Sequence, residues 1–600
     1  MSGVNCFPEW SRYQGNLRYQ LFTGLAWMNK QSPSRRRAGT AFLLLSLFLL
    51  ALAPRLYSAI TLGQDWDAPG SFTLINFDEG GSCRAALGGF DYSGFIGRQT
   101  IAIDRLLGGG PDPGVFGQMG PVKAYCHGAG HIRVARVYSA VSGALTVVLL
   151  TALGLVLVPR RPAIAWTAGG LLAVSGFHIS QSQSATVDAP SSFFIYLFLL
   201  LMAVLASRRK LAGLVLSPLL LVPAVWTKYW VFAVFAYLAF IPEQVYRYLT
   251  GGMSTLRVVL VVLAAALLFA ALSNSDFHAA GLYPVLALFY LVIPWRSVPR
   301  PMIAFWLLVP ALAYLLCRLE LIQEYTMGDM AGGFGTSYGA IGWHKWLRNL
   351  LNLPVLLAVG LGLPACVFLV VGLKRLFDGV ENLRPWLCLL PLVMFALYMA
   401  LVAPVTYYRH YLPLIPAAAL VAAYGLHSTA WSGRRWFMVL FFAWPVLLAM
   451  DLVGDYHRDP RLALRPWYAE HPGARIFISF YVSPPAGAAG YSRLFRPEFA
   501  AGNAEVLKQA DYLILSENWY DTAFANELNG PVVNDSRKLV KTRPSYTSFY
   551  RSTLEGSYPH LELVEAFEVR NFMPELLLHR RVYGTFQLFV GDIRISRVLK

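Results

Sequence analysis

Apolar runs of membrane-spanning length recur along this chain of 600 residues and constrain its fold more than any other feature. A helix needs about 20 mostly apolar residues to cross a bilayer, and runs of about 17–25 residues follow one another here. Only 14% of the residues are charged, whereas soluble domains carry about 25%. The sequence therefore predicts a polytopic α-helical membrane protein rather than a series of soluble domains.

The basic residues show how the chain crosses the membrane. A formal charge of +17 could also indicate a nucleic-acid partner, but the Lys and Arg residues cluster in short links between the apolar runs, as orientation signals do. No basic stripe marks a soluble domain, so we expect no nucleic acid partner. Three arginines, Arg35 to Arg37, precede the first run and place segment 1–37 in the cytoplasm.

The first apolar run, "AGTAFLLLSLFLLALA", also resembles a signal peptide with an A-x-A end. Pro54 follows that end directly, and we expect it to hinder cleavage. The run is therefore interpreted as a retained signal anchor.

Hydropathy and basic links together predict about thirteen spans within residues 38–454. The expected spans lie near 38–58, 134–158, 163–179, 190–206, 257–273, 280–294 and 301–317, with two short ones inside 211–242 and four between 350 and 453. Each basic cluster between spans then lies inside, and the odd count leaves the C-terminus outside. The count at 211–242 is open by one or two spans.

The composition changes at about residue 455. The stretches "ARIFISFYV" and "ADYLILSE" are typical of short buried strands, with "EVLKQA" as a helical step between them. Further strand character appears in "LELVEAFEV" and "TFQLFVGDIRISRV". Residues 455–600 are therefore expected to form an extracytoplasmic α/β domain, which either caps the membrane part or takes part in substrate binding.

Three acidic residues mark the outer edge of the membrane. Asp78 and Glu79 lie in the first outer loop, at about 59–132, and Asp188 lies in "SATVDAP" at the outer end of the third or fourth span. Acids at a bilayer edge are costly unless they face a cavity, so a functional site is expected here. The alternatives are solvated loop acids for the pair, and a helix cap for Asp188.

The order of several motifs resembles a known superfamily. The acidic pair is followed by "RVYSAVSGALTVV", "SQSQSATVDAPSSFFIYLFLL", "WTKYW" and "YYRHYLPLIPAAAL". This succession resembles the GT-C glycosyltransferases over about residues 38–453, most closely the protein O-mannosyltransferases and the lipid A aminoarabinose transferases. Gly80 and Gly81 depart from the usual form of the first loop.

The resemblance implies a multi-pass enzyme, of the bacterial inner membrane, that moves a hexosyl or pentosyl group from a polyprenyl-phosphate donor. The acceptor would be a protein, a lipid or a cell-envelope glycan on the outer face, and transfer would generally invert the anomeric centre. Asp78 is then the candidate base, Glu79 its supporting neighbour, and Asp188 orients the acceptor or a catalytic residue.

A lipid phosphate leaves in such a reaction, so cations are expected to offset its charge. Lys228, which interrupts an apolar run, and Arg409, at the outer end of a span, are the best candidates. Snorkelling to a headgroup is the alternative for both. Arg84 is a weaker phosphate candidate that also suits as the partner of a loop acid.

The remaining candidates concern the acceptor and metals. The loop "GGFGTSYGAIGWHKW", with Tyr338, could cover the acceptor or close over the lipid donor, and the alternative is an ordinary outer loop with interfacial Trp residues. His410 is a further acceptor candidate. The spacing of His127 and His131 in "CHGAGH" is compatible with a metal, but two histidines without a fixed carboxylate are weak evidence. We expect no cofactor and no divalent metal.

Cys83 and Cys126 share the first outer loop and would meet an oxidising compartment, so a disulfide is predicted between them. Three other functions stay open from the sequence: a transporter or flippase of lipid-linked sugars, a non-catalytic scaffold, and a ligase or polymerase of lipid-linked glycans. Midplane charges and internal repeats, which a transporter favours, are not evident.

Overall fold

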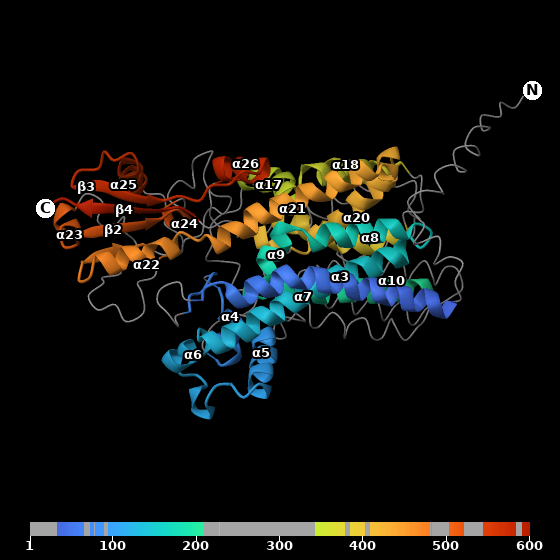
Figure 1. The fold of residues 1–600 in the computed structure, drawn as a ribbon, viewed down its shortest axis with the longest axis horizontal. Helices are drawn as coiled ribbons and strands as arrows, with labels where there is room; N and C mark the ends of the chain where they lie inside the picture. Colours follow the sequence, from blue (N-terminus) through green and yellow to red (C-terminus); the bar gives the residue numbers. More distant parts are fainter. Residues whose placement is uncertain are drawn as a thin grey trace, which may run out of the picture.

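The computed structural model describes the chain in segments (Figure 1). They are residues 33–64, 72–76, 78–88, 94–208, 227, 343–378, 384–401, 408–479, 482, 503–520, 544–583 and 591–600. The spans expected between 211 and 317 lie outside the described residues.

Apolar helices of membrane length form one bundle. Among the described residues, three helices are long and apolar enough to cross a membrane, within α3 (Pro33–Thr61), α7 (Ala129–Leu157) and from Arg435 to Glu470, which includes α21 (Arg435–His457). They coincide with the first, second and thirteenth expected spans. α3 leaves several large apolar side chains exposed along its length, as a lipid-facing helix does.

Two further expected spans are broken rather than straight. α8 (Pro162–Ala173) and α9 (Gly176–Ser182) meet at 59°, and Leu353–Leu361 meets α18 (Leu363–Phe377) at 118°. The second break corrects the expectation of one descending span after residue 350, since Gly362 adopts a φ of +85° that a helix cannot contain. With each bent pair taken as one span, the described residues hold up to five.

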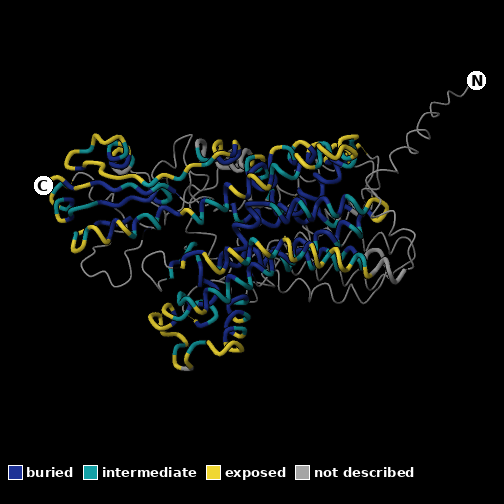
Figure 2. Tube along the Cα trace, in the orientation of Figure 1, coloured by how far each residue is buried: buried dark blue, intermediate teal, exposed yellow. Residues whose placement is uncertain are grey.

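The other bundle helices are shorter. They are α10 (Asp188–Arg208), α17 (Trp343–Leu361), α19 (Leu390–Leu401) and α20 (Leu414–His427). α7 packs against α3, α8 and α10, and α18 packs against α20. Gly425 of α20 lets these last two backbones approach, because a Cβ there would lie 1.9 Å from the Phe368 carbonyl oxygen. The bundle thus has one continuous apolar core (Figure 2).

The four segments expected as strands after residue 455 are strands in the structure. The described strands form one sheet in the order β1 (Ile476–Ile478), β2 (Tyr512–Ser516), β4 (Ile593–Val598) and β3 (Leu561–Phe567). β1 and β2 are parallel, while β4 is antiparallel to both its neighbours.

Helices cover both faces of this sheet. Side chains alternate between the faces along a strand, so Ile514 packs toward α22 (Arg461–Glu470) while Leu513 and Leu515 pack toward α25 (Pro544–Leu554). The short helices α23 (Ala504–Leu507) and α24 (Glu517–Tyr520) flank β2. A last helix, α26 (Pro574–Tyr583), leaves the sheet and packs on α17 and α21.

The loop after α3, which the sequence predicts on the outer side, folds into small helices that project sideways from the bundle (Figure 1). They are α4 (Gly81–Ala86), α5 (Phe95–Leu106), the 3-10 helix η1 (Pro113–Val115) and α6 (Met119–Cys126). The predicted disulfide is confirmed: Cys83 of α4 and Cys126 of α6 are bonded, with 5.7 Å between their Cα atoms. Both cysteines are buried, so the bond forms the centre of the loop's own small apolar cluster.

Candidate functional site

The acidic pair lies in a tight turn that leads directly into α4. Gly80 closes this turn with a φ of +77°, and a Cβ there would lie 2.7 Å from the backbone oxygen of Cys126. Only glycine fits both the left-handed backbone and the close approach. The Gly80-Gly81 departure from the usual loop therefore has a local reason, which is that the turn packs against the disulfide-bonded end of α6.

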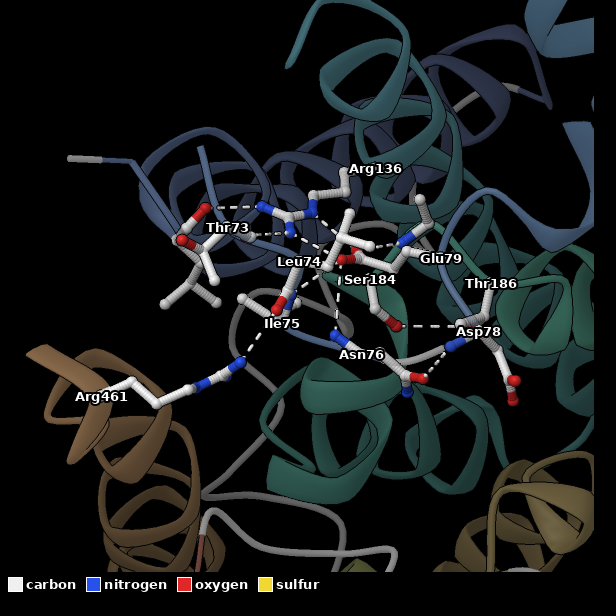
Figure 3. A network of polar contacts seen from close by, with 12 residues as sticks. Thr73, Leu74, Ile75, Asn76, Asp78, Glu79, Arg136, Ser184, Thr186 and Arg461 are labelled. Atoms are coloured by element: carbon white, nitrogen blue, oxygen red, sulfur yellow. Dashed lines mark hydrogen bonds and ion pairs between the residues drawn. The ribbon is translucent and has the colours of Figure 1, made fainter. Parts of the chain in front are cut away.

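Glu79 is wholly buried and forms the centre of a polar network (Figure 3). Its Oε1 accepts hydrogen bonds from Arg136 Nε at 2.7 Å and from the Ala185 N–H at 2.8 Å. Its Oε2 accepts from Arg136 Nη2 at 2.7 Å and from the Ile75 N–H at 2.9 Å. Glu79 thus joins the first outer loop, α7 and the α9–α10 connection.

The partner of Glu79 is equally enclosed. The Arg136 side chain is 0% exposed, donates to the Leu62 carbonyl oxygen at 2.5 Å and lies 4.7 Å from the Phe72 ring centroid. Oε2 also accepts a third hydrogen bond, from the Asn76 N–H at 3.4 Å, so both oxygens of the buried Glu79 carboxylate are engaged in contacts that hold the turn.

Asp78 points the other way from its neighbour, away from Arg136 (Figure 3). Its carboxylate forms an ion pair with Arg409, which lies on the 3-10 helix η5 (Tyr408–Tyr411) before α20. The two side chains are 35% and 18% exposed, so both can be reached from outside the protein. The Asp78 N–H donates to Asn76 Oδ1 at 2.9 Å, which fixes the backbone from which the carboxylate extends.

Arg84 lies on α4, in the turn of helix that follows the acidic pair. Burial lowers the pKa of its guanidinium, and the negative charge of Asp78 partly opposes that change. The structure therefore brings Arg84 into the electrostatic neighbourhood of Asp78, together with Arg409.

Asp188 is the first residue of α10 and is 1% exposed. A carboxylate in a first turn interacts favourably with the helix dipole. The segment before it is polar and buried: Ser180 to Ser184 and Thr186 are each at most 6% exposed. The N–H of Ala185, three residues before Asp188, donates to Glu79, so the segment that leads into α10 is bonded to the acidic pair.

The histidines of "CHGAGH" take separate roles. The His127 ring packs on the glycine turn at Gly80, and its pKa is lowered to about 4 by burial and by the charges of Arg84 and Lys123. His131 Nδ1 lies 3.1 Å from the Tyr125 hydroxyl and 3.5 Å from Asp104 Oδ2. Within the described segments, no three His, Cys, Asp or Glu side chains form a group that could hold a metal.

The remaining sequence candidates are placed only in part. His410 follows Arg409 on η5 but is 3% exposed, so it faces the protein interior. Lys228 and Tyr338 lie outside the described residues.

Sequence reasoning missed Arg136, the partner of Glu79. The signal was present, because Arg136 is a cation inside an expected apolar span, and such residues are rare unless they have a partner. It also missed Arg461 of α22, which donates to the Leu74 carbonyl oxygen at 3.0 Å (Figure 3). Nothing local in the sequence connects residues that lie so far apart.

No protein-family model and no curated protein matches this sequence. Among solved structures, the chain is similar to the oligosaccharyltransferase AglB from Archaeoglobus fulgidus in complex with an inhibitory peptide and a dolichol-phosphate. That similarity has a TM-score of 0.44 at 11% identity and covers 94% of this chain and 89% of that one.

Two further solved structures are similar to this chain. The apo form of the Archaeoglobus fulgidus oligosaccharyltransferase gives a TM-score of 0.42 at 12% identity, over 93% of this chain and 88% of that one. ArnT from Cupriavidus metallidurans, bound to undecaprenyl phosphate, gives 0.38 at 12% identity, over 83% and 97%. Every one of these TM-scores is below 0.5, so the function of this chain is inferred from its own residues.

Proposed function

We propose that this chain is an integral membrane glycosyltransferase that moves a sugar from a polyprenyl-phosphate donor to an acceptor on the extracytoplasmic face. The observation that carries the proposal is the partly exposed ion pair between Asp78 and Arg409. It joins the loop after the first apolar helix to the turn before α20. A carboxylate suited to accept a proton and a guanidinium suited to bind a phosphate thus lie side by side, one after the membrane-length helix α3 and one before the shorter helix α20.

The chemistry requires both groups. An acceptor hydroxyl attacks the anomeric carbon of the donor, and the bond between that carbon and the phosphate oxygen breaks. The hydroxyl proton passes to the Asp78 carboxylate, and the electron pair of the broken bond leaves with the lipid phosphate. Arg409 offsets the charge that grows on this phosphate. A single displacement of this kind inverts the anomeric centre.

The ion pair also suggests an order of events. In the resting protein, Asp78 and Arg409 neutralise each other. A donor phosphate, like a carboxylate, can accept two parallel hydrogen bonds from a guanidinium, so it would compete with Asp78 for Arg409. Donor binding would therefore draw Arg409 away and leave the Asp78 carboxylate available to the acceptor hydroxyl.

The surrounding residues take supporting roles in this proposal. Glu79 and Arg136 hold the turn that presents Asp78, because they fix it to α7 and to the α9–α10 connection. Arg84 adds positive charge near Asp78, and Lys228 is a further proposed contact to the phosphate. Asp188 is proposed to orient the acceptor or a residue of the site. Proteins, lipids and cell-envelope glycans are the acceptor classes to be tested.

The test uses the purified full-length protein with candidate polyprenyl-phosphate sugars and acceptors, and the product is identified by its mass. Asp78→Asn keeps the size of the side chain but removes the proton acceptor, so turnover should fall about 10²–10⁴-fold, while donor binding should be as tight as in the wild type or tighter. Arg409→Ala should weaken donor binding as well as turnover.

A matched control is Arg458→Ala, since Arg458 is another arginine with an acidic partner, at the C-terminal end of α21, but its side chain is 63% exposed and that partner, Asp455, lies within one helical turn. This variant should keep both donor binding and turnover. Near-normal transfer by well-folded Asp78→Asn would refute the assignment of the base. Movement of an intact lipid-linked sugar across the bilayer, without a transfer product, would favour the flippase instead.

A further inference from the structure

The last helix of the chain, α26, belongs to the membrane bundle as much as to the sheet. Leu576 is 0% exposed, and it joins Met573 in the same apolar cluster as α7, α18 and α20. In contrast, Leu577 and Leu578 on the opposite face are 49% and 54% exposed. The helix therefore packs one face into the bundle core, next to α17 and α21 (Figure 1).

Two buried carboxylates fasten the beginning of α26. Glu575 Oε1 accepts hydrogen bonds from the Leu363 N–H at 2.9 Å and from Trp444 Nε1 at 2.6 Å. Asp451 Oδ2, on α21, accepts from the two backbone N–H groups just before α26, at 2.8 and 2.7 Å. Charge-assisted bonds of this kind are short and directional, so the helix has one defined position on the bundle.

His579, one turn further along α26, reaches the turn that carries Arg409. The His579 side chain is 0% exposed, and its ring centroid lies 4.9 Å from that of Tyr408, with the ring planes at 60°. Tyr408 directly precedes Arg409 on η5, and Arg409 forms the ion pair with Asp78. Edge-to-face contacts between aromatic rings fix the orientation of both rings.

The segment after residue 455 also contacts the stretch of chain that precedes Asp78. Arg461 of α22 is held by Asp459, with 2.6 Å between Nη2 and Oδ2, and donates to the Leu74 carbonyl oxygen at 3.0 Å. Leu74 lies in the same turn-forming stretch as Asp78. Both partners of the ion pair are thus supported from the C-terminal part of the chain.

We propose that His579 is a positioning residue, which holds η5 so that Arg409 faces Asp78. The geometric claim stands on the contacts above, and its consequence for turnover rests on the proposed function. Without the imidazole ring, Tyr408 loses the contact that orients it, and the guanidinium of the next residue no longer meets the donor phosphate at the same place.

The kinetic test compares three variants of the full-length protein. An edge-to-face ring pair corresponds to about a two- to ten-fold effect, so His579→Ala should raise the donor KM by about this factor and change kcat less. His579→Phe retains a ring and should restore the donor KM. Leu576→Ala removes an equally buried side chain of the same helix, so it should lower the melting temperature but leave the donor KM within about two-fold. Equal donor KM changes in His579→Ala and Leu576→Ala would overturn the proposal.

A second measurement does not depend on turnover. Asp78→Cys and Arg409→Cys are introduced together, with the cysteines outside the Cys83–Cys126 disulfide replaced by alanine, and joined by a short bifunctional thiol reagent. The yield of the cross-link, read from the masses of the joined peptides, should fall when His579→Ala is added and recover with His579→Phe. An unchanged cross-link yield in His579→Ala would refute the positioning role. If the yield falls in His579→Ala and recovers in His579→Phe but the wild type forms no transfer product, only the proposed function is refuted.

Discussion

Substitution of Glu79 should lower the stability of the protein strongly, whereas substitution of its neighbour Asp78 should leave the stability almost unchanged. Glu79→Ala leaves the buried Arg136 guanidinium without its carboxylate, and it removes the acceptor of the Ala185 and Ile75 N–H groups. Breaking a buried ion pair costs about 3–5 kcal/mol, and each orphaned buried donor adds about 1–3 kcal/mol. Partial entry of water reduces the sum, so we expect a loss of about 5 kcal/mol at this junction, which is a large part of the stability of a typical domain.

Asp78→Asn provides the matched control, one residue away. Its ion pair with Arg409 is partly exposed, and such pairs contribute about 0–1 kcal/mol. Thermal unfolding of the purified protein in detergent, and the rate of proteolysis of the first outer loop, should therefore change in Glu79→Ala and stay near wild type in Asp78→Asn. Turnover should fall in both variants, for different reasons.

The double variant Glu79→Met/Arg136→Met tests whether the loss of stability in Glu79→Ala comes from the unpaired charge of Arg136 or from the missing side-chain volume. Replacing both partners of a buried ion pair with apolar side chains removes the uncompensated charge, so this variant should be more stable than Glu79→Ala. If Glu79→Ala melts at the same temperature as Asp78→Asn and its loop is cleaved no faster, the structural role given to Glu79 is wrong.

Three further predictions test the loop, the topology and the pH dependence. Cys83→Ser should cost about 3–4 kcal/mol of stability, since the disulfide closes a loop with a sequence separation of 43, and the loop of the variant should be digested faster than that of the unreduced wild type. A reporter that is active only in the cytoplasm should stay silent when fused after Lys600, and clear activity would overturn the proposed outer location of the C-terminal segment. The pKa of His127 is lowered from 6.5 to about 4 in the folded protein, so the unfolded chain binds the proton more strongly than the folded one. The free energy of unfolding is therefore undiminished by this group above pH 6.5 and decreases as the pH falls from 6.5 toward 4. His127→Gln should accordingly show a shallower fall in melting temperature between pH 6.5 and pH 4 than the wild type, and equal slopes would exclude the histidine as the cause.

The sequence by itself determined the features that depend on local composition. A long run of apolar residues in a bilayer is expected to be a helix, because a helix satisfies its backbone hydrogen bonds within one segment, and α3, α7 and α21 coincide with such runs. Alternating apolar residues likewise located the strands from β1 to β4. The pairing of Cys83 with Cys126 followed from their shared loop and from the chemistry of an oxidising compartment.

Local signals also indicated where the polar site lies but not how it is connected. Asp78, Asp188 and Arg409 were each recognisable as charged residues at the edge of a span. Hydropathy could not reveal the 118° break at Gly362, since the residues on both sides of it are equally apolar. The separate roles expected for Asp78, as base, and for Glu79, as its supporting neighbour, came from the family resemblance and not from the residues themselves.

Only the tertiary structure decided which acid is buried and which is exposed. Glu79 is committed to Arg136 and to the α9–α10 connection, while Asp78 turns toward Arg409. These partners come from helices far apart in the chain, and their meeting depends on how the bundle packs rather than on any pattern within one segment. The same holds for His579, whose contact with Tyr408 exists because α26 returns from the sheet to the bundle. A charge or a ring in a sequence has no partner until the fold supplies one, since the energy of the contact depends on distance and burial.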